Sequence, residues 1–468
     1  MALTFACSEK DPVDPGGTGG TGPVGGTAGI GPTGGTGVTG GTAGIGTGGS
    51  GVGGTSGAAG SAGSALGGSA GASSGGAGTG GSSGAGATGG VTAGSGGAAG
   101  GIGGASGAAG AGGAAGSSGA GGKAGAGGGT FNPPFILGAD ISSVQEGNST
   151  FRDTDGQTKS IFALLKNHGF NYIRMKAFVE PSAPYGYAST ANGCPGMNEP
   201  YGDKAHVVEF GQLIKGAGMG FLLDFHYSDV WADPGNQIIP APWRNATSIT
   251  DLAARMKAYT LDVIRTAIAA GARPDMVQVG NEITPGLLMH VPGSNTDCYG
   301  NNPDDAPFGG GTSNWNNLAT LLRAGIEGVR EADPTIQVML HLENTSNLAG
   351  VRSWVDSARQ RDVVFDILGL SCYEEYQGPP STWQNTFTQL VTSYPDLKFV
   401  IAEYNPQRTQ ANLIMKNLPN GAGRGTFFWE PTRSGDWGPS LFTWSGNTAT
   451  AITSDFAEFD ALRPQLGL

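Results

Sequence analysis

The stretch 207-VVEFGQLIKGAGMGFLLDFHYSD-229 contains a helix candidate that leads directly into a strand candidate. Four apolar residues in its first half recur at helical spacing and share one face: Phe210, Leu213, Ile214 and Ala217. The run 220–225 that follows is short and apolar, and the polar His226 comes directly after it. A helix followed by a buried strand is the repeating unit of a parallel α/β sheet.

The same alternation of apolar runs and helical segments continues through residues 131–468. The strand candidates are 135–139, 171–175, 220–225, 276–280, 337–342, 364–370, 398–402 and 425–429. Helix candidates lie between them, such as 159–168, where Ile161, Leu164, Leu165 and His168 share a face. Eight strand–helix units predict a (β/α)8 TIM barrel of the α/β class. A doubly wound open sheet is the alternative, but no glycine-rich phosphate turn follows the first strand.

Residues 16–130 differ in composition from the rest of the chain. The stretch 16–129 contains 55 of the 88 glycines and no aromatic residue, so it cannot bury a core. We expect a disordered Gly/Ser/Ala/Thr-rich linker that precedes one folded domain at 131–468. A flexible chain of this length spans on the order of 60 Å, enough to hold a domain away from a surface. A low-complexity insertion without a role is the alternative.

Residues 1–15 form a separate N-terminal segment. Cys7, which precedes the long linker, resembles the lipid-modified cysteine at the mature start of a bacterial lipoprotein. An ordinary secreted protein and a cytoplasmic protein are the alternatives that the sequence leaves open. We expect an extracellular or surface-tethered protein. No run of about 20 apolar residues occurs, so we expect no membrane-spanning helix.

The net charge and the aromatic content indicate which kinds of partner the protein can bind. The formal net charge is −12, and almost all of it falls on residues 131–468 together with all eight tryptophans. Binding to nucleic acid needs clustered lysine and arginine, so we expect no nucleic acid partner. An acidic domain rich in aromatic residues suits a neutral ligand, and we expect a monomer without a cofactor. Asp297, Asp304 and Asp305 share one loop, but their spacing matches no calcium loop, so we expect no metal.

Polar side chains stand where the strand candidates end, which is where a barrel of this type places its active site. They are Asp140, Arg174, His226, Asn281, Glu282, Tyr373, Glu403 and Trp429. Two carboxylates across one barrel mouth can cleave a glycosidic bond, because one donates a proton while the other attacks the sugar carbon. Strands four and seven would bring Glu282 and Glu403 to about 5 Å, the separation typical of retaining enzymes.

The neighbours of the two glutamates have plausible tasks. Asn281 can hydrogen-bond the sugar 2-hydroxyl, and Arg174 and Tyr373 can hold Glu403 ionised. The pKa values of the two glutamates must differ, because the donor stays protonated while the nucleophile stays ionised.

A second group is expected to bind the sugar. His226 can hydrogen-bond a sugar hydroxyl or the proton donor, and Trp429 can form a flat floor for a sugar ring. The remaining candidates for substrate binding are Asp140, Asp229 and Trp231. Taken singly, these residues also have structural interpretations, such as an ion-paired Arg174 or a packed Trp231.

Six segments follow one another in the order of a known family. They are 138-GADISS-143, 171-NYIR-174, 223-LDFHYSD-229, 231-WADP-234, 277-VQVGNEI-283 and 428-FWEP-431. These segments resemble glycoside hydrolase family 53, the arabinogalactan endo-β-1,4-galactanases, from residue 135 to about residue 441. The resemblance implies a clan A barrel and a retaining mechanism on the galactan side chains of pectic arabinogalactan, with Glu282 as acid/base and Glu403 as nucleophile.

The sequence departs from the family pattern near the expected sugar subsites. Phe178 stands where tryptophan is usual, two residues after the basic Lys176. The sixth strand ends in 372-CYEE-375 rather than in two tyrosines and a proline, and 404-YNP-406 after Glu403 is also unusual. Two alternatives to a galactanase therefore stay open. One is a barrel hydrolase that acts on another β-linked polysaccharide, and the other is a tethered carbohydrate-binding protein.

Three cysteines lie in the expected domain. Cys194 and Cys298 fall in the long loops after strands two and four, and Cys372 ends an apolar strand. In an oxidising compartment the first two can form a disulfide between neighbouring loops, with Cys372 as a buried thiol. Free thiols are the alternative.

Overall fold

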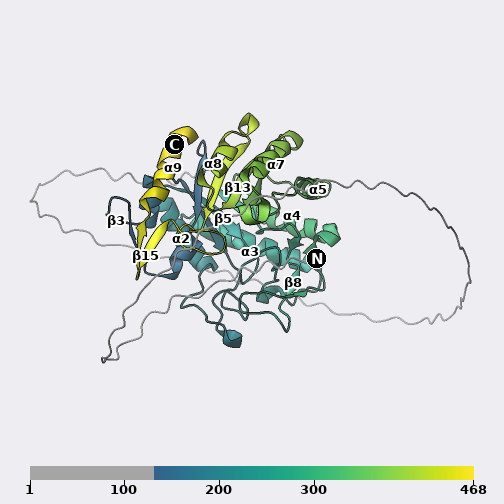
Figure 1. Ribbon diagram of the computed structural model, residues 1–468. Coiled ribbons are helices and arrows are strands. Elements are labelled where there is room, and N and C mark those ends of the chain that lie inside the picture. The colour runs from purple at the N-terminus through teal and green to yellow at the C-terminus, as the bar shows by residue number, and fades with distance from the viewer. Residues whose placement is uncertain (1–130) are drawn as a thin grey trace, which may run out of the picture. The chain divides into compact units, whose positions relative to one another are not determined.

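The computed structural model describes residues 131–468, so the predictions for the segment at 1–15, for Cys7 and for the linker at 16–130 lie outside the described residues. The described part contains a closed barrel of eight parallel strands (Figure 1). These are β1 (Ile136–Asp140), β4 (Tyr172–Ala177), β5 (Gly220–Phe225), β6 (Met276–Val279), β11 (Gln337–Leu342), β12 (Ile367–Cys372), β13 (Lys398–Tyr404) and β14 (Gly423–Trp429). The barrel closes because β1 pairs in parallel with both β14 and β4. The predicted TIM barrel is confirmed.

Helices follow the strands and cover the outside of the barrel (Figure 1). They are α1 (Ile161–Asn167), α2 (Lys204–Gly216), α3 (Ile249–Ala269), α4 (Trp315–Ala332), α5 (Leu348–Arg359), α6 (Glu374–Gln377), α7 (Pro380–Ser393), α8 (Arg408–Lys416) and α9 (Thr453–Leu466). Ser160, Asp203 and Ser248 begin α1, α2 and α3, and each side chain accepts a hydrogen bond from the backbone N–H three residues later.

One predicted helix face is partly wrong. In α2, Phe210 and Ile214 are buried as expected, but Leu213 is 52% exposed. The buried face of α2 also includes Val207 and Gly211. At 100° per residue this face points about a third of a turn away from Leu213, which the sequence spacing alone did not reveal.

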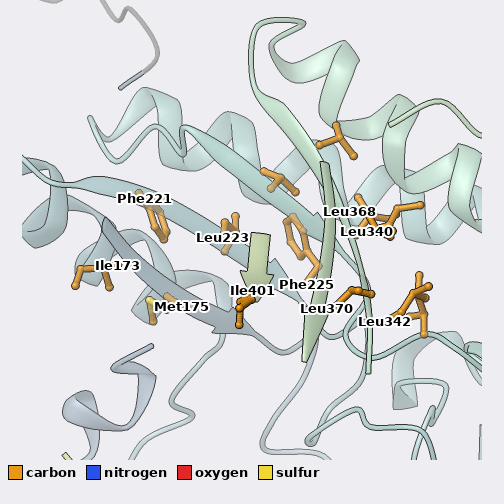
Figure 2. Close-up of a cluster of buried hydrophobic side chains, with 14 of the residues drawn as sticks. Ile173, Met175, Phe221, Leu223, Phe225, Leu340, Leu342, Leu368, Leu370 and Ile401 are labelled. Atoms are coloured by element: carbon orange, nitrogen blue, oxygen red, sulfur yellow. The ribbon is translucent and has the colours of Figure 1, made fainter. Parts of the chain in front are cut away.

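The barrel interior has an apolar layer below a polar one. Side chains of the lower layer include Ile136, Tyr172, Leu222, Met276, Met339, Ile367, Val400 and Phe427. Successive side chains of a strand alternate between its two faces, so residues two or four positions further on also point inward, at the carboxyl ends. In this way Tyr172 is followed by Arg174 and Lys176. The outward-facing side chains form the larger cluster under the helices, part of which Figure 2 shows.

Glycines make room for the aromatic rings of the lower layer. A Cβ atom at Gly138 would lie 2.3 Å from Cδ1 of Phe427, and one at Gly220 would lie 2.1 Å from Cε2 of Tyr172. These strands therefore pack rings where a larger residue would collide.

The described residues also form smaller sheets that the sequence did not predict. The largest has the order β15-β16-β2-β3, from β15 (Phe442–Ser445), β16 (Thr448–Ala451), β2 (Thr150–Arg152) and β3 (Thr158–Lys159). Its strands β16 and β2 pair in parallel although about 300 residues separate them. Two-stranded sheets join β7 (Gly286–Leu287) to β10 (Gly310–Gly311) and β8 (His290–Val291) to β9 (Asp304–Asp305).

Of the two expectations for Cys194 and Cys298, a disulfide or two free thiols, the structure shows the disulfide. Cys194 and Cys298 form a disulfide across 104 residues, which links the loop after β4 to the loop after β6. Cys372 is a buried free thiol at the end of β12. Within residues 131–468, no helix combines the length and the apolarity that crossing a membrane requires.

Candidate active site

Arg174 lies at the centre of the polar layer and is fully buried. Its guanidinium donates to Asp140 Oδ2 (3.2 Å), Glu403 Oε1 (2.8 Å), Asp224 Oδ2 (2.8 Å), Asn281 Oδ1 (2.8 Å) and Gln278 Oε1 (3.2 Å). Burial acts to lower the pKa of Arg174, but the three carboxylates raise it, so the side chain stays charged. One cation thus holds acceptors from β1, β5, β6 and β13 together at the carboxyl ends of the strands.

Glu403 is buried beside this cation. Its Oε1 accepts from Arg174, and its Oε2 accepts from the hydroxyl of Tyr373 at 3.1 Å. A register shift in the pairing of β12 with β13 brings Glu403 opposite Ser371. Burial raises the pKa of Glu403 to about 7, and Arg174 opposes that rise.

Glu282 has different surroundings. It follows β6 with a left-handed backbone (φ 48°), a conformation that costs energy for a residue with a Cβ. Its Oε1 lies 2.6 Å from Ser371 Oγ, and among residues 131–468 no lysine or arginine forms an ion pair with it. Burial raises the pKa of Glu282 well above its usual range, and the charge of Glu403 adds to the rise. Of the two predicted catalytic glutamates, only Glu403 therefore has a cation as a partner.

Hydrogen bonds behind Glu282 fix the tautomer of His341. Arg174 and Gln278 both donate to Asn281 Oδ1, so this oxygen is an acceptor. His341 Nδ1, 2.8 Å from the same oxygen, must then carry a hydrogen and donate it. Burial and the nearby Arg174 lower the pKa of His341 well below its usual range, so the ring is neutral and its Nε2 is an acceptor.

The only donor to this Nε2 among the described contacts is Ser371, whose Oγ lies 2.9 Å away. The serine hydroxyl has one hydrogen and two neighbours that can accept it, His341 and Glu282. When Glu282 is protonated, it can donate to Ser371 Oγ while Ser371 donates to His341, and every group is satisfied. When Glu282 is ionised, the hydroxyl can turn to Glu282 and leave His341 Nε2 without a donor. Ser371 can therefore hydrogen-bond both forms of Glu282, as an acceptor from the acid and as a donor to the carboxylate.

Aromatic rings form the walls of the mouth. The rings of Trp231 and Trp429 lie 5.6 Å apart at 66°, and both are partly exposed. His226 Nδ1 accepts from the backbone N–H of Ala232 (2.8 Å), which leaves the hydrogen on Nε2. That Nε2 has no hydrogen-bond partner among the described residues, although Asp224 Oδ2 lies 3.2 Å away. His226 can therefore donate a hydrogen bond to a ligand.

Comparison with known proteins gives the family. The family model described as Glycosyl hydrolase family 53 matches residues 136–460, more than half of the chain. The chain belongs to glycoside hydrolase family 53. The endo-β-1,4-galactanase of Bacillus subtilis is 28% identical over 334 residues, covering 64% of this chain and 70% of the relative. An arabinogalactan endo-β-1,4-galactanase of Cellvibrio japonicus is 29% identical over 337 residues, covering 64% and 81%.

Solved structures show the same fold. The catalytic domain of a family 53 protein from Ignisphaera aggregans superimposes with a TM-score of 0.57 at 24% identity, covering 69% of this chain and 95% of that one. A fungal β-1,4-galactanase gives 0.55 at 24% identity, covering 69% and 98%. The solved structures thus show the barrel fold, and the family match makes the chain a glycoside hydrolase.

Two carboxylates of this glycoside hydrolase that were predicted to bind substrate accept hydrogen bonds from the protein itself. Asp229 accepts hydrogen bonds from the backbone N–H groups of Glu180 (2.9 Å) and Ala241 (2.6 Å), and burial raises its pKa to about 6. Asp140 accepts from the backbone and side chain of Ser142 as well as from Arg174. Asp229 therefore joins the loops after β4 and β5, and Asp140 helps to orient Arg174.

A buried group that the sequence analysis missed lies behind Trp231. Lys176 Nζ lies 3.2 Å from the ring centroid of Trp231 and 3.9 Å from Glu430 Oε1. Ser143 donates a short hydrogen bond to the other oxygen of Glu430. Burial raises the pKa of Glu430 to about 7, against the influence of Lys176. The period of two from Arg174 to Lys176 was the available signal, because it places both side chains inside the barrel.

Proposed function

We propose that this glycoside hydrolase is a retaining endo-β-1,4-galactanase that cleaves the galactan side chains of pectic arabinogalactan. The galactanase names of its relatives support the substrate. The unequal surroundings of the two glutamates are the observation on which the mechanism depends. Glu282, next to neutral Ser371 and His341, is the acid/base, and Glu403, next to Arg174, is the nucleophile.

The first step breaks the glycosidic bond. Glu282 gives its proton to the leaving oxygen while the Glu403 carboxylate attacks the anomeric carbon and forms a covalent glycosyl–enzyme. Arg174 and Tyr373 hold Glu403 for this attack through both of its oxygens. As Glu282 becomes negative, the Ser371 hydroxyl can turn from His341 to Glu282 and stabilise the new charge.

The second step releases the sugar. Glu282, now ionised, takes a proton from a water molecule that attacks the same carbon, and Glu403 leaves as a carboxylate. The configuration is retained because the carbon is inverted twice. Arg174 stabilises the departing carboxylate through the hydrogen bond that it made at the start.

The remaining mouth residues bind and orient the sugar. Asn281 Nδ2 uses one hydrogen on the carbonyl of Ala232 and has a second for the 2-hydroxyl. His226 Nε2 donates to another hydroxyl, and Trp429 and Trp231 pack against the C–H face of a ring.

The proposed place of action is outside the cell, either as a free protein or through a lipid on Cys7, with the chain as a monomer. The Cys194–Cys298 disulfide supports an oxidising compartment. Labelled fatty acid incorporation into the full chain and into Cys7→Ala tests the anchor, since only the unsubstituted chain should take up label. Sedimentation of the purified chain tests the monomer.

Reducing-sugar release by the full chain tests the main proposal. Linear β-1,4-galactan is the substrate, with xylan, mannan, arabinan and β-glucan alongside and Glu403→Ala as the control. Release from galactan alone, abolished by the substitution, is the expected result. Proton NMR of the first product should show the β anomer. Release from a different glycan would overturn the assignment of galactan as the substrate. Binding without release from any glycan would overturn the hydrolytic mechanism.

A further inference from the structure

A small pocket lies beside the nucleophile, between the ends of β12 and β13 and the loop that follows β14. Its volume is about 210 Å³, and it is lined by Tyr373, Glu374, Glu375, Tyr376, Asn405, Pro406, Gln407, Asp436, Trp437 and Gly438. Tyr373 is also the side chain that donates to Glu403, so the pocket adjoins the reacting centre. Pockets for larger ligands have about 300–1,000 Å³. This one has room for a single ring.

Three buried polar atoms of this pocket have no hydrogen-bond partner among the described residues. They are Asn405 Oδ1, Gln407 Oε1 and Trp437 Nε1. Asn405 is only 2% exposed, and its Nδ2 donates to the carbonyls of Trp429 and Pro439 (3.2 Å each), which identifies Oδ1 as the acceptor. Leaving a buried acceptor without a donor is unfavourable. One donor and two acceptors match a ligand whose hydroxyl groups both accept and donate.

The loop that contains Trp437 is fixed by backbone hydrogen bonds. Gly435 and Gly438 exchange two backbone hydrogen bonds of 3.0 Å across the turn that contains Trp437. A Cβ atom at Gly438 would lie 2.4 Å from Asn405 Oδ1, and its φ of 140° also suits only glycine. The close approach of this loop to Asn405 therefore depends on glycine, and it holds Trp437 at the same pocket as Asn405.

The charge of the pocket restricts its ligand. Glu374, Glu375 and Asp436 are exposed carboxylates at its rim, and none of the ten lining residues is lysine or arginine. Gln407 Nε2 donates to Glu374 Oε2 at 2.7 Å, which turns the amide so that Oε1 remains available. The carboxylate of a uronic acid would be repelled by these three side chains, whereas a neutral sugar carries no charge that they repel.

We propose that this pocket is a subsite for one neutral sugar residue of the polysaccharide, near the residue that Glu403 attacks, and that it excludes a uronic acid. The inference rests on the proposed glycosidase chemistry, but not on galactan as the glycan. The lining residues 373–375 and 405–406 fall in the two segments, 372–375 and 404–406, in which the sequence departs from the family pattern.

The first test is Trp437→Phe in the full chain, which keeps a ring but removes the indole N–H. The matched control is Trp444→Phe in β15, since Trp444 donates to the carbonyl of Thr432 and does not line the pocket. We expect Trp437→Phe to lower kcat/KM about 2- to 10-fold on long oligosaccharides, mainly through KM, because one neutral hydrogen bond is lost. An aryl monoglycoside, which leaves the pocket empty, should show no change. Equal kcat/KM for the wild type and both variants at every chain length would show that the pocket holds only water.

The second test concerns charge. Glu374→Gln combined with Glu375→Gln should raise kcat/KM for oligosaccharides that contain a uronic acid relative to neutral ones. An unchanged ratio would overturn the exclusion.

The oligosaccharides in both tests come from whichever glycan the wild type hydrolyses. If the wild type does not hydrolyse galactan, the pocket can therefore still be tested with another glycan. If the wild type hydrolyses none, calorimetric binding of the same oligosaccharides to the full chain and to Trp437→Phe replaces the kinetics. Equal affinities would then overturn the subsite.

Discussion

At the scale of single residues, the hydroxyl of Ser371 has to form a hydrogen bond with Glu282 in both protonation states of Glu282. Ser371→Ala removes it, and we expect kcat to fall about 10- to 100-fold on polysaccharide, because a hydrogen bond to a charged group is lost. An activated aryl glycoside needs no proton donation for its first bond cleavage, so the loss there should be much smaller. Equal losses on both substrates would contradict the assignment of Ser371 to the acid/base.

The pH dependence follows from the two glutamates. The proposed mechanism needs Glu403 ionised and Glu282 protonated, so kcat/KM should fall as the pH drops through about 7, where Glu403 takes up a proton. The raised pKa of Glu282 keeps the acid protonated at neutral pH.

The charge of Asp224 raises the pKa of Glu403, so Asp224→Asn should move the acidic limb to lower pH. A pH–rate profile of both proteins measures this shift. An acidic limb that stays in place or moves to higher pH in Asp224→Asn would refute the proposed influence of Asp224.

The sequence predicted some residues of the site and not others, for a physical reason. Residues at strand ends, such as Arg174 and Glu403, were predicted because a barrel brings all carboxyl ends to one mouth. Ser371 and His341 were missed because their significance depends on hydrogen bonds between three strands. Glu430 lies in the segment 428–431, but its partner Lys176 comes from β4, and no local pattern links them.

At the scale of elements, the lower barrel layer depends on Gly138. We expect Gly138→Ala to reduce the free energy of unfolding by about 1–3 kcal/mol, because its methyl group would collide with the ring of Phe427. Gly147→Ala is the matched control, since its Cβ would meet no atom closer than 3.6 Å and its backbone is extended. Urea denaturation measures both. Similar stabilities for the two variants would show that Phe427 can move aside.

The strands of the barrel could be predicted because each contains a short run of mostly apolar residues between helical segments. The small sheet that contains β2 and β16 could not, because its strands have two to four residues and pair across most of the domain. The range 364–370 was predicted as one strand, but β12 begins only at Ile367, and Val364 is 71% exposed. Apolar character alone does not distinguish a loop residue from the start of a strand.

At the scale of the whole molecule, the Cys194–Cys298 bond closes a loop of about 100 residues. Such a bond restricts the unfolded chain, so Cys298→Ser should lower the free energy of unfolding by about 2–5 kcal/mol. Urea titrations with and without a reductant give an internal control. The reductant should destabilise the wild type and leave Cys298→Ser unchanged. An equal effect on both would mean that the bond contributes no stability.

The pairing of β1 with β14 has a consequence for how the protein is made. A ribosome releases β1 long before β14, and the barrel cannot close until both are available. Until then Trp429 is missing from the mouth and the lower layer lacks Phe427. The sheet of β2 and β16 and the contact between His168 and Asp460 of α9 need the last part of the chain in the same way. A nascent chain therefore lacks a complete mouth, and the proposed activity begins only once synthesis of the domain is complete.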